Sequence, residues 1–203
     1  MKRRIVTLLT LACVVAVPGV VMADEENGSG PNHVVQVQNT QDPDFGTATT
    51  RTRGGIQVGS TGADRVTSTN LAIAAPHDCT GCEARAAAYQ AVFLTGNPSY
   101  VSPRNAAVAT NANCTSCGSF AFAYQYVVTT DGPVYLSEAG RDHIRDIRAA
   151  VRDDLDAGYP YDVLDARLHD YAVEFRSVIN AQIRRTGTEV EDRHAIERTR
   201  ESG

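Results

Sequence analysis

The chain has 203 residues, of which 42% are hydrophobic and 21% are charged, with five cysteines and no tryptophan. Its formal net charge of −5 at pH 7 argues against nucleic acid or an anionic membrane surface as a partner, because both repel an acidic protein. Lys2 is the only lysine, so lysine nucleophiles and Schiff bases are excluded once the first residues are removed.

The first 23 residues have the pattern of a cleavable secretory signal peptide. A basic start is followed by the apolar run Ile5 to Val17 and by small residues that end at Ala23. Cleavage after Ala23 would remove three basic residues and no acidic one, taking the net charge from −5 to −8. We therefore expect a secreted, extracytoplasmic protein that begins at Asp24 and has no membrane span after cleavage.

Two other interpretations of this segment are open. Cys13 could carry a lipid, although the apolar run continues for several residues beyond it. Ile5 to Met22 could instead remain as an anchor, although it is shorter than the roughly 20 residues of a typical spanning helix. Pro18, Gly19 and the small residue at position 23 favour cleavage.

A β-rich domain is predicted over residues 33–136, after a flexible acidic spacer at 24–32. His33 to Asn39 alternates valine with polar residues, as a short strand does. Residues 41–70 are rich in threonine, glycine, serine and aspartate, which is typical of two or three short strands with long turns.

The main feature of this domain is an internal repeat: residues 70–104 align without a gap on 105–139, and 15 of the 35 pairs are identical. In each copy, residues alternate between two strand faces, a turn-rich C-T-x-C stretch follows, and the alternation then resumes. The pattern predicts a β-hairpin in each copy.

The second strand of each copy has two different faces. One face of Phe120 to Val128 is aromatic and the other is rich in alanine, and the first copy keeps only the alanine face. We expect both faces to be covered, with the alanine faces close to a common neighbour, for example each other across a pseudo-twofold axis. The alternative is that both faces are ordinary core.

Two helices are predicted over residues 137–187. Ser137 can cap the first, whose apolar residues are spaced by three or four, and Gly158 ends it. Pro160 and Asp162 open the second, which carries one apolar stripe. The charged tail, 188–203, is expected to fray.

Cys79, Cys82, Cys114 and Cys117 form two C-T-x-C pairs, for which we favour structural disulfides because export leads to an oxidising compartment. Pairing across the repeat would close the longer loops, which the chain-entropy model favours. Two copies of one unit, however, should each keep a self-contained bond, so we expect Cys79 with Cys82 and Cys114 with Cys117.

Two other interpretations of the cysteines are a zinc site made from both pairs and a redox-active C-x2-C. Zinc is disfavoured by thiol oxidation outside the cell. Redox catalysis is disfavoured because the neighbours Asp78, Thr80 and Asn113 would not activate a thiolate. We therefore expect no metal and no cofactor.

Other candidate residues are polar groups within apolar runs. An unpartnered buried amide costs about 1–3 kcal/mol, so Gln90 and Gln125 should form hydrogen bonds, for instance to Asn70 or Asn105. Together with Tyr89 and Tyr124, these residues are structural polar groups or, alternatively, a recognition site. The chain has no H-E-x2-H, G-x-S-x-G, G-x-G-x2-G or phosphate-loop motif, so an enzyme is the less favoured class.

The combination of N-A-A-V-A, C-T-x-C and A-x-A-Y-Q-x-V, followed by a charged helical tail, resembles repeats in exported proteins of GC-rich actinobacteria. Such repeats also form the extracytoplasmic tail of membrane-bound peptide zinc metalloproteases. The resemblance covers about residues 70–155 and implies an exported accessory or surface module. The chain lacks the zinc motif of those metalloproteases, so no catalytic residue is carried over.

These patterns together predict an α+β fold, in which an antiparallel β-hairpin repeat domain precedes a C-terminal helical hairpin. The function that they favour is an exported, non-enzymatic interaction or structural module that two disulfides stabilise and that binds a protein or cell-envelope partner. The alternatives are an extracytoplasmic thiol-disulfide oxidoreductase and a zinc-binding module.

Overall fold

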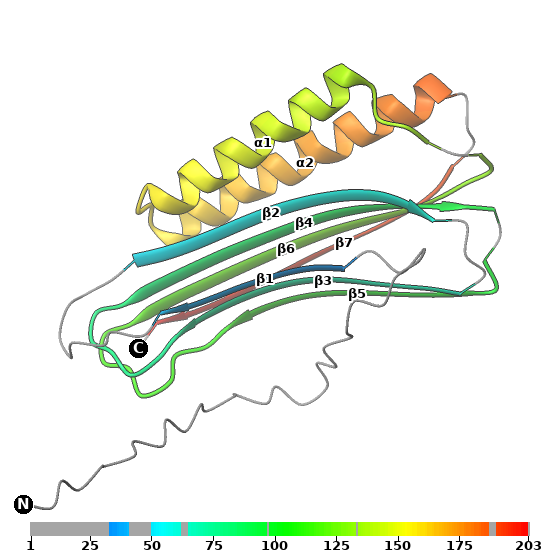
Figure 1. Cartoon of the computed structure of the whole chain (residues 1–203). Helices are drawn as coiled ribbons and strands as arrows, with labels where there is room; N and C mark the ends of the chain where they lie inside the picture. Colours follow the sequence, from blue (N-terminus) through cyan, green and yellow to red (C-terminus); the bar gives the residue numbers. More distant parts are fainter. Residues whose placement is uncertain are drawn as a thin grey trace, which may run out of the picture. The chain divides into compact units, whose positions relative to one another are not determined.

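A computed structural model describes residues 33–40, 50–61, 65–96, 98–132, 134–186 and 190–202, which belong to a compact unit spanning 31–203 (Figure 1). The predicted signal peptide and acidic spacer lie outside these residues. Among the helices described, none is both long and apolar enough to cross a membrane.

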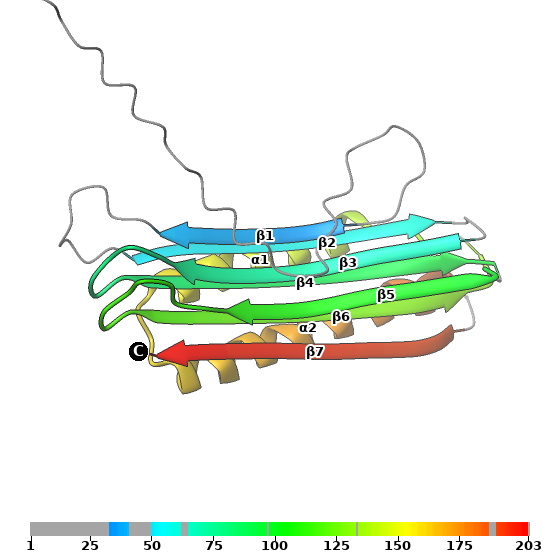
Figure 2. The same cartoon turned by 90° about the horizontal axis from the view of Figure 1, so that it is seen from below.

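The described residues form seven strands in two sheets, together with two helices (Figures 1 and 2). The three-stranded sheet has the order β1-β3-β5, and the four-stranded sheet has the order β2-β4-β6-β7. Within these residues, all neighbouring strands are parallel except β6 and β7. In chain order the elements are β1 (His33–Thr40), β2 (Thr50–Thr61), β3 (Arg65–Pro76), β4 (Glu83–Thr95), β5 (Tyr100–Ala109), β6 (Gly118–Thr130), α1 (Glu138–Asp156), α2 (Tyr161–Thr186) and β7 (Val190–Ser202).

The α+β class and the C-terminal helical pair are confirmed, but the pairing expected within each sequence copy is wrong. β3 and β4 belong to different sheets; β3 pairs with β5, and β4 pairs with β6, in parallel. Every residue pair in both registers is separated by 35 positions. A hairpin and this arrangement have the same alternating pattern, and they differ in whether the turn returns the chain to its own sheet or carries it to the opposite one.

Two successive strands on opposite sheets make one coil, and the coils stack along the direction of the interstrand hydrogen bonds. β3 with β4 and β5 with β6 are the coils of the two sequence copies. β1 and β2 form an earlier coil, which pairs with the next one at separations of 36 and 33 residues. Gln57 of this coil is in register with Gln90 and therefore with Gln125. Parallel stacking of this kind is the architecture of a β-solenoid.

Much of the space between the two sheets is filled by alanine, and the rest by polar side chains and by a second apolar cluster made of Val66, Val92, Leu94 and Val127. The alanine faces of the two copies are related by the stacking of coils and not by the pseudo-twofold that the sequence suggested, since equivalent alanines such as Ala86 and Ala121 are neighbours in one sheet. Small side chains allow two backbones to approach closely. The buried cluster consists of Ala72, Ala74, Ala84, Ala86, Ala88, Ala121 and Ala123.

The opposite face of the β4 and β6 strands packs under the two helices. Tyr89 makes edge-on contact with Phe175 of α2, at 6.2 Å between ring centroids, and Tyr124 does the same at 6.2 Å. Full burial of each such ring contributes about 1.5–3 kcal/mol. The apolar stripes predicted on both helices are buried in this cluster, which includes Ile144, Ile147, Val151, Leu155, Leu164, Leu168, Phe175, Val178 and Ile183.

The helix boundaries follow the predicted signals. The Ser137 hydroxyl accepts a hydrogen bond from the Gly140 amide at 3.1 Å, and Gly158, with a φ of 71°, follows the end of α1. Between the helices, the buried Asp154 carboxylate accepts hydrogen bonds from Arg167 at 2.6 and 2.9 Å and from Tyr171 at 2.8 Å.

The charged tail does not fray as expected, because most of it forms β7. This strand pairs antiparallel with β6 from Gly118↔Ser202 to Thr130↔Val190. The backbone N–H and C=O groups along the outer edge of β6 need hydrogen-bond partners, and β7 supplies them. Because β7 is charged, the new sheet edge that it forms is less prone to pair with another chain. The Thr199 hydroxyl also donates a 2.7 Å hydrogen bond to the Ala107 carbonyl of the other sheet.

Enlarging an interior alanine should separate the sheets. We expect Ala123→Leu to lower the free energy of unfolding by about 1–3 kcal/mol, because Ala123 has no exposed surface and the new carbons have no space. Urea denaturation would measure this. The matched control, Ala166→Leu on the exposed side of α2, should stay within about 0.5 kcal/mol of the parent. Equal effects of the two substitutions would contradict a closely packed interior.

Candidate functional site

The four cysteines of the two C-T-x-C pairs lie in two turns that stack on one another. Residues 77–82 connect β3 to β4, and residues 110–117 connect β5 to β6. The backbone ladder between coils continues through the turns: the Thr115 amide donates to the Cys79 carbonyl at 3.2 Å, and the Gly118 amide donates to the Cys82 carbonyl at 2.9 Å. The Gly81 amide donates to the Thr115 carbonyl at 2.9 Å. The turns are therefore held together by main-chain contacts that do not depend on the sulfur atoms.

Each turn bends the chain with two residues in the left-handed region. Asp78 (φ 53°) and Gly81 (φ 69°) do so in the first turn, and Asn113 (φ 51°) and Ser116 (φ 55°) do so in the second. Asparagine, aspartate and glycine are the residues that tolerate this conformation best, whereas serine is less suited to it. The turn sequences D-C-T-G-C and N-C-T-S-C thus share one backbone shape.

Both predicted disulfides form within their own turns. Cys79 bonds to Cys82, with 6.2 Å between the Cα atoms, and Cys114 bonds to Cys117, with 5.7 Å between the Cα atoms. Cys79, Cys82 and Cys117 are buried, and Cys114 is partly buried.

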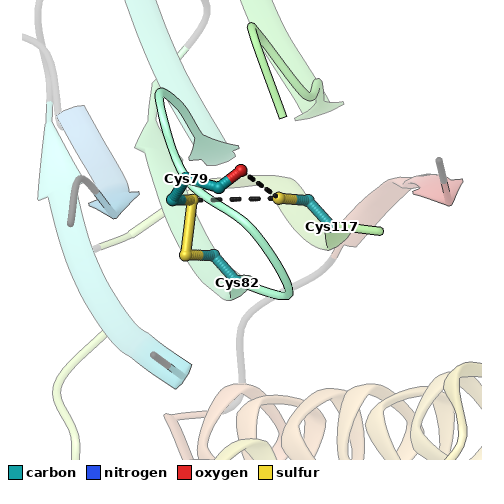
Figure 3. A group of neighbouring side chains, drawn as sticks. All are labelled: Cys79, Cys82 and Cys117. Carbon is teal, nitrogen blue, oxygen red and sulfur yellow. Dashed lines mark hydrogen bonds between the residues drawn. A yellow bond between two sulfur atoms is a disulfide. The ribbon is translucent and has the colours of Figure 1, made fainter. Parts of the chain in front are cut away.

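The two disulfides are also in contact with each other. The Cys79 sulfur lies 3.5 Å from the Cys114 sulfur. It also lies 3.8 Å from the Cys117 sulfur, and the Cys79 carbonyl lies 3.6 Å from the Cys117 sulfur (Figure 3). This contact is a direct consequence of the register, since Cys79 and Cys114 are 35 residues apart.

A polar pair links the same turns on their exposed side. The Asn113 amide donates a 3.1 Å hydrogen bond to the Asp78 carboxylate, and His77 lies 3.3 Å from the other carboxylate oxygen. The hydrogen bond from Asn113 is the main reason that the pKa of Asp78 is lowered, with His77 the next cause.

The predicted amides form polar ladders between the sheets. The Asn70 amide donates to the Asn105 side chain at 2.7 Å and to the carbonyls of Ala88 and Tyr124. Asn105 donates to Ala123 at 3.1 Å, which repeats the Asn70 contact one coil later. These contacts tie one sheet to the other.

The two glutamines form a second ladder. The Gln125 amide donates to the Gln90 side chain at 2.7 Å and to the Ser68 hydroxyl at 3.2 Å, and Gln90 donates to the Thr69 carbonyl at 3.4 Å. The two glutamines therefore bond to each other and to Ser68 and Thr69 of β3.

The two tyrosines that precede the glutamines point to the helical side. The Tyr89 hydroxyl donates a 2.9 Å hydrogen bond to the Leu168 carbonyl of α2, and its burial raises the pKa well above the usual value. Tyr124 is buried in the same cluster. The structure thus brings the glutamines into the interior and the tyrosines under α2, because neighbouring strand residues face opposite sides.

A buried charge near the turns was missed by the sequence analysis. Arg85 is only 2% exposed; it pairs with Glu83 at 2.8 Å and lies 5.4 Å from the centre of the Tyr161 ring. Burial, followed by the charge of Glu83, raises the pKa of Tyr161 to about 12. A side chain at Gly118 would collide with the Tyr161 hydroxyl. In the sequence, Arg85 is a single arginine within an alternating strand, and no local pattern predicts its burial against Glu83 and Tyr161.

These features define the chain as a parallel β-solenoid that is covered on one face by two helices and carries stacked disulfide turns at one end of its coils. Comparison of the chain with protein-family models, with curated proteins and with solved structures finds no match.

Glycine should fit the second turn better than serine does. We expect Ser116→Gly to raise the free energy of unfolding by up to about 1 kcal/mol, because it relieves the left-handed strain at the cost of unfolded-state entropy. Gly81→Ala should lower the same quantity by about 1–2 kcal/mol. Chemical denaturation of both variants under oxidising conditions would measure the effects, and a destabilised Ser116→Gly variant would argue against the common turn shape.

Alkaline pH should weaken the fold partly through Tyr161. Its folded pKa is raised from 10.0 to about 12, so the folded state favours the neutral phenol. That contribution is complete below pH 10 and is lost as the pH rises from 10 to about 12. We expect Tyr161→Phe to lose less stability than the parent over this range in urea denaturation series. Parallel pH profiles for the two proteins would contradict the prediction.

Proposed function

We propose that the chain is an exported, non-enzymatic module whose disulfide-bonded solenoid serves in structure or interaction at the cell surface, with a protein or cell-envelope component as its partner. The observation that supports this proposal most directly is the pair of disulfides at equivalent positions of two consecutive coils. Disulfides persist in oxidising compartments, and the signal-like N-terminal sequence would deliver the chain to one.

The structural role of the disulfides follows from their position. They fasten the turns at one end of coils whose interior contains mainly alanine, where little apolar area is buried per residue. A loop as short as C-x2-C contributes about 2 kcal/mol on the chain-entropy model, so two bonds would supply about 4 kcal/mol. This amount is a large fraction of the stability of a typical domain.

The surroundings of the cysteines favour this role over thiol-disulfide exchange with a substrate. A catalytic C-x2-C needs an accessible first sulfur near a helix N-terminus or a positive charge. Cys79 is 7% exposed, occupies a turn between strands, and follows an aspartate whose lowered pKa keeps it charged.

Thiol mapping of the exported protein tests the proposal. We expect an intact mass that begins at Asp24, no alkylation without reductant, and peptides that join Cys79 to Cys82 and Cys114 to Cys117. The paired variants Cys79→Ser/Cys82→Ser and Cys114→Ser/Cys117→Ser should each lose about 2 kcal/mol of unfolding free energy under oxidising conditions, while under reducing conditions they should match the parent much more closely. Free thiols in the exported protein, or a retained signal segment, would overturn it.

A further inference from the structure

The sulfur atoms are arranged more compactly than two independent disulfides require. The ligand atoms of Cys79, Cys82 and Cys117 all lie within 4.8 Å of one another, and these three residues are buried. The fourth sulfur, on Cys114, lies 3.5 Å from that of Cys79. Three sulfurs of the described turns therefore form one compact group between two coils, and the fourth lies beside it.

This spacing is close to that of a tetrathiolate metal site. Zinc binds four thiolates tetrahedrally at about 2.3 Å, which places the sulfurs about 3.8 Å apart. The distances from Cys79 to the two sulfurs of the other turn are 3.5 and 3.8 Å. Two C-x2-C pairs also have the ligand spacing of structural zinc sites.

The main chain would keep the ligands in place after the disulfides open. Hydrogen bonds from Thr115 to Cys79 and from Gly118 to Cys82 join the turns at the ligand residues themselves. Reduction leaves these bonds intact, so only side-chain rotation is needed to separate the sulfurs within each turn. A site held in this way loses little conformational entropy when it binds metal.

We propose that the reduced form of this cluster binds Zn²⁺ through Cys79, Cys82, Cys114 and Cys117, so that the same four cysteines either close each turn with a disulfide or join the two turns through a metal. Two equivalents of a dithiol reduce the two disulfides to four thiols and are themselves oxidised to disulfides. Zinc then replaces four thiol protons, which are released to solvent. The inference goes beyond the proposed function, since the disulfide form alone would satisfy that function.

The test is zinc binding by the exported chain after reduction with a dithiol and removal of the reductant without oxygen. We expect about one zinc per chain by native mass spectrometry, tetrahedral thiolate spectra with Co²⁺ as a substitute, and protection of all four cysteines from alkylation by zinc. Failure of the reduced chain to bind zinc, whether or not its strands persist by circular dichroism, would overturn the inference and leave the disulfide proposal standing.

Variants identify the ligands. Each paired serine variant keeps only one C-x2-C and should bind zinc at least about 100-fold more weakly, since even the loss of contacts around ligands costs 10- to 100-fold. His77→Ala, which removes the histidine nearest in sequence to Cys79, should bind as the parent does. Undiminished binding by both paired variants would place the metal elsewhere and overturn the proposal. Alkylation mapping of the parent decides the question without any variant, should the variants not fold.

Discussion

The structure depends on one constraint, which is that consecutive coils stack in register. Between the last two coils the offset is 35 residues on both sheets, and the hydrogen-bond ladder continues through the turns that connect them. Each residue therefore lies beside its equivalent. Asparagine pairs with asparagine, glutamine with glutamine, and cysteine with cysteine. Changing the register by one residue would direct alanines toward the helices and aromatic rings into the interior. The alanine and aromatic faces of the strands therefore favour the same register as the backbone hydrogen bonds.

The two faces of the four-stranded sheet perform different tasks. The alanine face allows the sheets to approach each other, and the Asn70 and Gln125 side chains bridge them with hydrogen bonds. The aromatic face packs under α1 and α2 and supplies many of the large buried side chains. Because the alanine interior buries little apolar area, the helices and the disulfide turns are needed to stabilise the coils. β7 completes the sheet by covering the edge of β6.

The backbone shape of the two C-T-x-C turns determines where their sulfur atoms lie. Left-handed residues at equivalent positions give both turns one shape, and stacking brings their sulfur atoms into contact. The same geometry is compatible with oxidised sulfur and with a thiolate site, because the backbone and not the sulfur sets the positions of the cysteine Cα atoms. Which state exists depends on the redox conditions of the compartment.

Sequence reasoning correctly anticipated the local features of this protein: the alternating strands, the helical pair with its Ser137 cap, and disulfides within each C-T-x-C. These depend on periodicity, capping and short loops, which neighbouring residues determine. Only the tertiary structure decided how the strands pair. Alternation is the same in a hairpin and in a solenoid, so the sheet to which a turn delivers the chain cannot be deduced from the pattern. The coil of β1 and β2 does not follow the 35-residue sequence repeat, because its strands lie 36 and 33 residues before their partners in the next coil. β7 forms because the edge of β6 is available for pairing. These pairings depend on contacts between residues far apart in the chain, and the charged sequence of β7 contains no local pattern that predicts a strand.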